Sequence, residues 1–138
     1  MIQKYVYGNP FPTEAVVEEF AQAAGAPAYG CIETEKGFCF TYQMEESDIV
    51  YGLGEANRGL NKRGYSYTSN CTDDPNHTED KRSLYGAHNF IVVAGKKTFG
   101  LFFDYPSNIT FDIGYTRMDT LKVSCEGTDL NLFVIDGE

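Results

Sequence analysis

The feature that most constrains this chain is a series of short apolar segments, beginning near residue 30 and separated by turn residues. Each segment either alternates apolar and polar side chains or is apolar throughout, and each ends near Gly, Asn, Asp or Pro. A period of two is typical of half-buried strands, and turns at this spacing are typical of a β-sandwich. The expected strands are 31–34, 38–43, 49–53, 65–69, 90–94, 98–104, 109–113, 121–126 and 129–135. The sequence therefore predicts an all-β fold, a β-sandwich.

Two short connections predict how some of these strands pair. The turn AGKK joins FIVVA to TFGLFFD, and both flanks are apolar enough to be central strands of a hairpin. The turn CEGTD joins LKVSC to LNLFVID in the same way and predicts a second hairpin. Ten Tyr and ten Phe accompany the Val and Ile of these segments, which is the side-chain composition of pleated sheets.

The first 29 residues have a different pattern. Segment 2–7 alternates weakly, and a short helix is predicted after it, capped by Thr13 and ended by Gly25. The apolar stripe of this helix would consist of Val16, Val17, Phe20, Ala21 and Ala24. We expect residues 1–29 to form a strand and a short helix that pack on a sandwich made by residues 30–138.

Charge and hydropathy exclude several classes of partner. The chain has 20 acidic and 11 basic residues, a net charge of −9, and the charges are scattered rather than grouped into a basic stripe. Nucleic acid and anionic membranes are therefore not expected as partners. No apolar run approaches the roughly 18 residues of a membrane span, and no apolar leader follows the first lysine. We expect a cytoplasmic protein.

No motif predicts a metal or cofactor site. The four cysteines lack CxxC spacing and closely spaced histidines, so they are interpreted as reduced thiols. His77 with Glu79 and Asp80 could be proposed as metal ligands, but a solvated polar loop explains the same residues. The glycines of GLGEANRG lack the GxGxxG spacing and the following helix of a phosphate-binding loop. We therefore expect neither a metal nor a cofactor.

The long irregular stretch 70–86 is where a site is expected, because loops of this length in compact domains are usually functional or disordered. Asp73 and Asp74 invite comparison with the paired carboxylates of glycosidases, which flank one bond about 5–10 Å apart. Adjacent residues generally point in different directions, so a catalytic pair is not indicated. These acids could accept hydrogen bonds from sugar hydroxyls, or they could form a solvated turn.

Five motifs resemble one enzyme family in order and approximate spacing. They are YGLGEANRGLNKRGYSYTSNCTDDP at 51–75, SLYGAHNFIV from 83, TFGLFFDYPS from 98, ITFDIG from 109 and LNLFVIDG from 130. Together they closely resemble the N-terminal domain of the family 31 glycoside hydrolases, the α-glucosidase family. The resemblance covers about residues 49–137, and the first 48 residues are much less distinctive.

The resemblance implies a galactose mutarotase-like β-sandwich that precedes a (β/α)8 barrel, expected after residue 138. In this family the barrel holds both catalytic aspartates of a retaining mechanism, so we expect no catalytic residue in this chain. The chain is then an accessory domain of an α-glucosidase that hydrolyses terminal α-linked glucose from oligosaccharides. Its expected partners are that α-linked substrate and the enzyme's own barrel.

The resemblance also assigns a role to one residue of the long loop. Aligning YTSNCTDDP with the family form YTMWNTDNP places at Asp73 the aspartate that hydrogen-bonds the sugar on the leaving-group side. Asn70 and Cys71 depart from the family form, so no aromatic ring is available there for sugar stacking. The polar residues Asn57, Lys62 and Arg63 are interpreted as structural, holding the base of the loop by hydrogen bonds and ion pairs.

Two alternatives remain at this point. A free-standing carbohydrate-binding β-sandwich would use the aromatic residues and the acidic loop equally well. An aldose mutarotase shares the architecture, but it needs a histidine and a glutamate as acid and base. Neither His77 nor His88 stands in a motif for that role.

Overall fold

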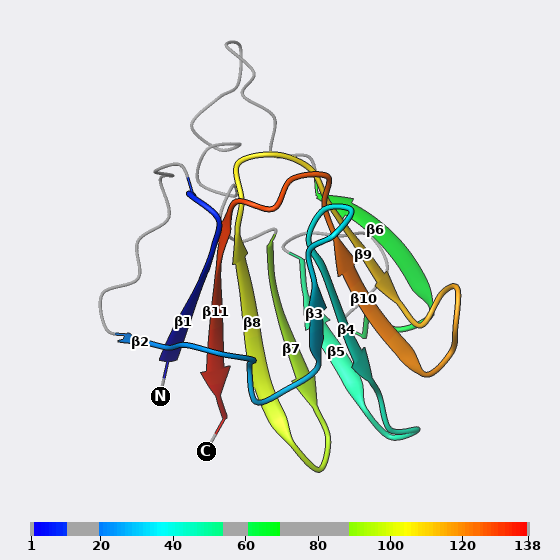
Figure 1. Ribbon diagram of the computed structural model, residues 1–138. Helices are drawn as coiled ribbons and strands as arrows, with labels where there is room; N and C mark the ends of the chain where they lie inside the picture. Colours follow the sequence, from blue (N-terminus) through cyan, green and yellow to red (C-terminus); the bar gives the residue numbers. More distant parts are fainter. Residues whose placement is uncertain (1, 11–19, 54–60, 70–88, 138) are drawn as a thin grey trace, which may run out of the picture.

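The path of the chain is given by a computed structural model that describes residues 2–10, 20–53, 61–69 and 89–137. These residues form two β-sheets that pack face to face (Figure 1). The six-stranded sheet has the order β2 (Ala21–Gln22), β1 (Ile2–Tyr7), β11 (Leu130–Asp136), β8 (Thr98–Asp104), β7 (Phe90–Ala94) and β5 (Ile49–Gly52). The five-stranded sheet has the order β3 (Cys31–Glu33), β4 (Cys39–Gln43), β10 (Thr120–Ser124), β9 (Ile109–Ile113) and β6 (Tyr65–Ser69). The predicted all-β sandwich is confirmed.

Every segment expected to be a strand is one. The bounds of β6, β7, β8 and β9 are those expected, and the other expected strands differ by one or two residues at their ends. The hairpin across AGKK is also confirmed, because β7 and β8 pair in antiparallel fashion with Ala94 opposite Thr98. The period-two patterns were therefore sufficient to locate these strands.

The core lies between the sheets and is dominated by aromatic rings. Phe103 of the six-stranded sheet contacts Phe38, Phe40 and Phe111 through edge-to-face ring pairs with centroids 5.8–6.0 Å apart. All four side chains are essentially inaccessible to solvent. Each fully buried ring stabilises the fold by about 1.5–3 kcal/mol relative to an exposed one. The two layers are thus held together by large side chains from both sheets.

The described part of the predicted helix is not helical, and this prediction is wrong there. Ala21 and Gln22 form β2, which pairs in parallel with Gln3 and Lys4 of β1. The N–H of Ala23 donates to the carbonyl oxygen of Lys4 at 2.9 Å. The edge of β1 thus satisfies the backbone groups of this segment, and tertiary pairing overrides the helical periodicity. Residues 11–19, including the expected cap Thr13, lie outside the described residues.

The second predicted hairpin is also wrong. Strand β10 pairs with β4 and β9 in one sheet, whereas β11 pairs with β1 and β8 in the other. The connection CEGTD therefore crosses between the two sheets, as Figure 1 shows at one end of the sandwich. The strands before and after this connection pair with strands from distant parts of the chain, and the residues of the turn alone do not predict those partners.

The N-terminal strand is part of the six-stranded sheet, where all six of its residues pair with β11. The expected division at residues 1–29 and 30–138, and the barrel after residue 138, remain predictions. No helix within the described ranges is long and apolar enough to cross a bilayer.

Candidate functional site

The motif that begins at Tyr51 turns the chain sharply at the end of β5. Gly52 and Leu53 both have positive φ, of 121° and 63°, and Leu53 is the only non-glycine residue in the described ranges with that conformation. A Cβ atom on Gly52 would collide with the carbonyl oxygen of Phe90 on the neighbouring strand. The N–H of Leu53 donates to that same oxygen at 3.0 Å. Glycine is therefore required here both for its φ and for the close approach of β7.

The chain returns to β5 through Asn61 and Lys62. The side-chain oxygen of Asn61 accepts hydrogen bonds from the N–H groups of Val50 (3.3 Å) and Arg63 (3.2 Å). The N–H of Lys62 donates to the carbonyl oxygen of Val50 at 2.7 Å, and the Lys62 side chain is buried. These bonds hold Asn61 and Lys62 against Val50 in the middle of β5. Asn57 lies outside the described residues.

Arg63 joins the β4–β5 turn to the β9–β10 turn. Its Nη1 donates to the carbonyl oxygens of Glu45 (2.7 Å), Glu46 (3.2 Å) and Asp48 (2.9 Å). Its Nη2 donates to the carbonyl oxygen of Met118 at 3.1 Å. A planar guanidinium can reach several acceptors at once in fixed directions. Arg63 therefore has a structural role, as predicted, but these bonds hold the β4–β5 and β9–β10 turns together rather than the base of the long loop, and its partners are backbone carbonyls.

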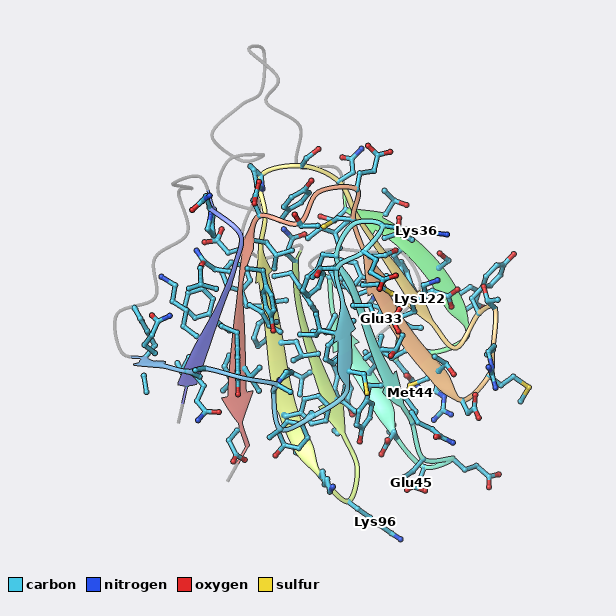
Figure 2. The ribbon with its side chains drawn as sticks, viewed as in Figure 1. Glu33, Lys36, Met44, Glu45, Lys96 and Lys122 are labelled. Atoms are coloured by element: carbon cyan, nitrogen blue, oxygen red, sulfur yellow. The ribbon has the colours of Figure 1, made fainter. Side chains whose placement is uncertain are left out.

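The β4–β5 turn also contains a buried carboxylate with a structural role. Asp48 is only 3% exposed, and its Oδ2 accepts a hydrogen bond from the N–H of Glu45 at 2.8 Å. Its other oxygen lies against Gly95 in the β7–β8 turn, where a Cβ atom would collide with it. Figure 2 shows Glu45 and Lys96, which mark these two turns, at the same end of the molecule. Asp48 therefore fixes the β4–β5 turn against the β7–β8 turn.

The loop 70–88 begins and ends on buried polar residues. Ser69 is the last residue of β6, pairs with Ile109 and is 6% exposed. Asn89 directly precedes β7 and is 1% exposed. Because β6 and β7 belong to different sheets, the two ends of the loop are held on opposite layers of the sandwich. Asp73, with Asp74, His77 and His88, lies outside the described residues, and its role stays a prediction.

Three further connections, β3–β4, β8–β9 and β10–β11, lie at the same end of the sandwich as Ser69 and Asn89 (Figure 1). The N–H of Gly127, between β10 and β11, donates to the hydroxyl of Tyr105, after β8, at 3.1 Å. The thiol of Cys125 donates to the carbonyl oxygen of Gly127 at 3.4 Å, and the N–H of Phe38 donates to the same oxygen at 2.9 Å. These bonds brace this end with groups from three connections. No sequence signal pointed to Tyr105 or Gly127.

Burial makes two thiols of the described residues, those of Cys39 and Cys125, poor nucleophiles. Burial raises the pKa of Cys125 to about 11, so its nucleophilic thiolate is scarce near neutral pH. Burial also raises the pKa of Cys39. Both are free thiols, as is exposed Cys31, whereas Cys71 lies outside the described residues. In the ranges that the structure describes, no three His, Cys, Asp or Glu side chains are grouped as metal ligands.

Known proteins share this fold. A family model described as the glycosyl hydrolase 31 N-terminal galactose mutarotase-like domain matches residues 11–112. A family 31 dextranase from Flavobacterium johnsoniae, solved with glucose, is 21% identical with a TM-score of 0.60, over 78% of this chain and 13% of its own. An uncharacterized Listeria monocytogenes protein is 17% identical with a TM-score of 0.53, over 75% of this chain and 10% of its own. No curated protein matches the sequence.

These similarities differ in what they establish. TM-scores of 0.60 and 0.53 show that the fold is shared, and identities near 20% limit that inference to the fold. This chain spans only about a tenth of the length of each of those two proteins. The family model is more specific, because it covers well over half of the sequence, including the motif around Gly52 and the strands on both sides of the long loop. The chain therefore belongs to the N-terminal galactose mutarotase-like domains of glycoside hydrolase family 31.

Proposed function

We propose that this chain is the accessory N-terminal domain of a retaining α-glucosidase that removes terminal α-linked glucose from oligosaccharides. Family membership carries this proposal. In a retaining enzyme, one carboxylate attacks the anomeric carbon while a second protonates the leaving oxygen, and water then releases the glycosyl intermediate. Both carboxylates are expected in a catalytic barrel that follows residue 138.

The contribution of this chain is the loop 70–88, with Asp73 as the residue that contacts the substrate. The buried residues Ser69 and Asn89 support this role, because they anchor the two ends of the loop on different sheets. The bonds between Tyr105 and Gly127 brace the same end of the sandwich. A carboxylate on a loop with fixed ends could accept hydrogen bonds from two adjacent hydroxyls on the leaving-group side of the substrate.

The test is Asp73→Ala in the full-length enzyme, with Asp74→Ala as the matched control. Loss of one charged hydrogen bond to the leaving sugar should raise KM for maltose about tenfold. The same substitution should leave KM for p-nitrophenyl α-glucoside within about twofold, since this leaving group offers no sugar hydroxyls. Asp74→Ala should change neither constant by more than about twofold. Equal effects of Asp73→Ala on both substrates would refute the assigned role.

The reaction itself is tested separately with maltose, isomaltose and dextran. Release of glucose from the ends of short α-linked oligosaccharides would support an α-glucosidase. Internal cleavage of dextran would replace that assignment within the same family, in which the Flavobacterium relative is named a dextranase. No hydrolysis of any of the three would contradict the proposal at the level of the enzyme.

A carbohydrate-binding module is the second candidate, and exposed tyrosines favour it. Tyr115 is 65% exposed and Tyr65 is 41% exposed, and the Tyr65 ring lies 6.4 Å from that of Tyr67. Exposed aromatic faces can stack on the apolar face of a pyranose. Calorimetry of the 138-residue chain with maltose and isomaltotriose discriminates: binding that is lost in Tyr65→Ala would favour a module, and no binding would favour the accessory domain.

A further inference from the structure

The outer faces of the two sheets have opposite character. On the five-stranded sheet, the side chains that alternate with core residues are all polar or thiol-bearing. They are Cys31, Glu33, Cys39, Thr41, Gln43, Ser66, Thr68, Thr110, Asp112, Thr120, Lys122 and Ser124. Figure 2 shows Glu33 and Lys122 on this sheet. This is the usual pattern of an antiparallel sheet with one face in water.

The six-stranded sheet does not follow this pattern. Val50 and Val93 are fully buried in the core, so their neighbours Tyr51 and Val92, which pair with each other, project from the outer face. The same alternation places most of the other apolar residues of β5, β7, β8 and β11 that are not in the core on this outer side, and we call this group the apolar face. It consists of Ile49, Tyr51, Phe90, Val92, Ala94, Phe102, Phe133 and Ile135. Four polar residues, Lys4, Thr98, Asp104 and Asn131, lie on the same side towards its borders. Strands that are apolar on both faces are typical of sheets covered on both sides.

One part of the apolar face is covered within the described residues. Phe133 is only 5% exposed: the Phe20 ring meets it edge-on at 5.7 Å, and the Phe102 ring stacks on it at 5.8 Å. The Lys4 ammonium lies over the rings of both Phe20 and Phe133, at 5.0 and 5.8 Å from their centroids. Phe20 and Lys4 thus cover the apolar face on the β1–β11 side of the sheet.

The β5–β7 side is more open. Tyr51 is 38% exposed, and Ile49, Phe90 and Val92 are half-buried. Gly100 makes this surface flat, because a Cβ atom there would lie 3.2 Å from the Phe90 ring, which covers the glycine. A contiguous apolar surface of this kind on a sheet marks an interaction site.

We propose that the apolar face docks on the catalytic domain of the same polypeptide, an inference that rests on the proposed function. The related chains of known structure are far longer than this one, so each has a large partner in cis. The β5–β7 part of this face, made of Ile49, Tyr51, Phe90, Val92 and Ala94, contains no charged residue, as expected for the centre of a permanent interface. The charged residues Lys4 and Asp104 lie on the same outer side, on β1 and at the end of β8. A second copy fits less well, because each chain carries a net charge of −9 and two copies repel each other.

Docking through the apolar face would also affect the long loop 70–88. Strand β7 contributes Phe90, Val92 and Ala94 to the apolar face, and it begins directly after Asn89, where the loop 70–88 ends. Docking through β7 would therefore hold one end of the loop at the border of the catalytic domain. The polar outer face of the other sheet would remain in water.

The test is hydroxyl-radical footprinting of the full-length enzyme, with two tyrosines of matched exposure. Tyr51 lies on the apolar face and is 38% exposed, whereas Tyr65 lies on β6 of the other sheet and is 41% exposed. If the apolar face is covered, oxidation of Tyr51 should be slower than that of Tyr65 by roughly fourfold or more, because the core of an interface excludes water. Equal rates for the two tyrosines would overturn the proposal.

Two further measurements distinguish docking in cis from dimerisation, and test it separately from the proposed function. Protection of Tyr51 that rises with protein concentration, together with dimerisation, would assign the face to a second copy and overturn docking in cis. Hydrolysis of α-glucosides is assayed on the same sample. An active enzyme with unprotected Tyr51 would sink the docking proposal alone, whereas protected Tyr51 in an inactive protein would support docking and contradict the proposed function.

Discussion

Arg63 offers the sharpest test of how the sandwich is stabilised at the end where the β4–β5 and β9–β10 turns meet. In Arg63→Ala, four hydrogen bonds from one guanidinium to backbone carbonyl oxygens are lost. The bond to Asp48 is partly buried, and a charged hydrogen bond of that kind contributes about 1.5–3 kcal/mol. The other three are exposed, and water can replace the donor, so each contributes only a few tenths of a kcal/mol. The free energy of unfolding should fall by about 2–3 kcal/mol.

The assay is equilibrium unfolding of the 138-residue chain in urea, followed by circular dichroism. A loss of about 2–3 kcal/mol lowers the urea midpoint by about 1–2 M at the slopes usual for small proteins. Arg117→Ala is the matched control, because this arginine is exposed in the β9–β10 turn, and it should cost less than about 0.5 kcal/mol. Arg63→Lys should recover only part of the loss, since an ammonium cannot reach the four acceptors in the same geometry. If Arg63→Ala and Arg117→Ala differ by less than about 0.5 kcal/mol, the reasoning is refuted.

Two other perturbations test the turns. Gly64→Ala should cost about 1–2 kcal/mol of stability, because the space beside Gly64 is open and only its φ of 99° is unfavourable. Gly52→Ala should cost at least about 3 kcal/mol in the same urea assay, since its Cβ atom also meets the backbone of Phe90, and equal losses would contradict this account. Burial opposes ionisation of Asp112, but hydrogen bonds from the following turn outweigh it, and its pKa lies below the ordinary 3.8. The difference in free energy of unfolding between wild type and Asp112→Asn should therefore be complete above pH 3.8 and shrink as the pH falls through the lowered pKa of the folded state. A difference that does not change with pH would contradict this role of the ionised Asp112.

Much of the fold could be predicted from local patterns. The strand from Phe90 to Ala94 and the strand from Thr98 to Asp104 had the expected bounds, because a period-two or continuous apolar segment between turn residues specifies a strand directly. A structural role for Arg63 was also predicted, but neither its carbonyl partners nor its place between the β4–β5 and β9–β10 turns was. The helix that was expected to end at Gly25 failed in its described part, because the segment pairs with β1 instead. Gly25 does have a positive φ, of 81°, but the element before it is the strand β2.

The candidate site was less predictable. The family resemblance indicated Asp73 as a candidate site residue. The sequence contained no signal that Ser69 and Asn89 are the buried residues at the two ends of the loop, because their burial depends on strands from both sheets. The bond between Tyr105 and Gly127 joins residues separated by β9 and β10 and has no local pattern. The apolar face had a signal in the unbroken apolar runs of β7 and β11, yet such runs do not say which side is the core.

The sequence by itself determined the all-β class, the places of most strands and the family, because these depend on short-range periodicity and on motifs that are contiguous along the chain. Only the tertiary structure decided which sheet each strand joins, and CEGTD is the clearest case, since it leads from one sheet to the other. Burial and backbone pairing between distant residues determine which strands become partners, and local sequence patterns do not contain that information. For the same reason, the contrast between a polar and an apolar outer face became visible only once the strands were assigned to their sheets.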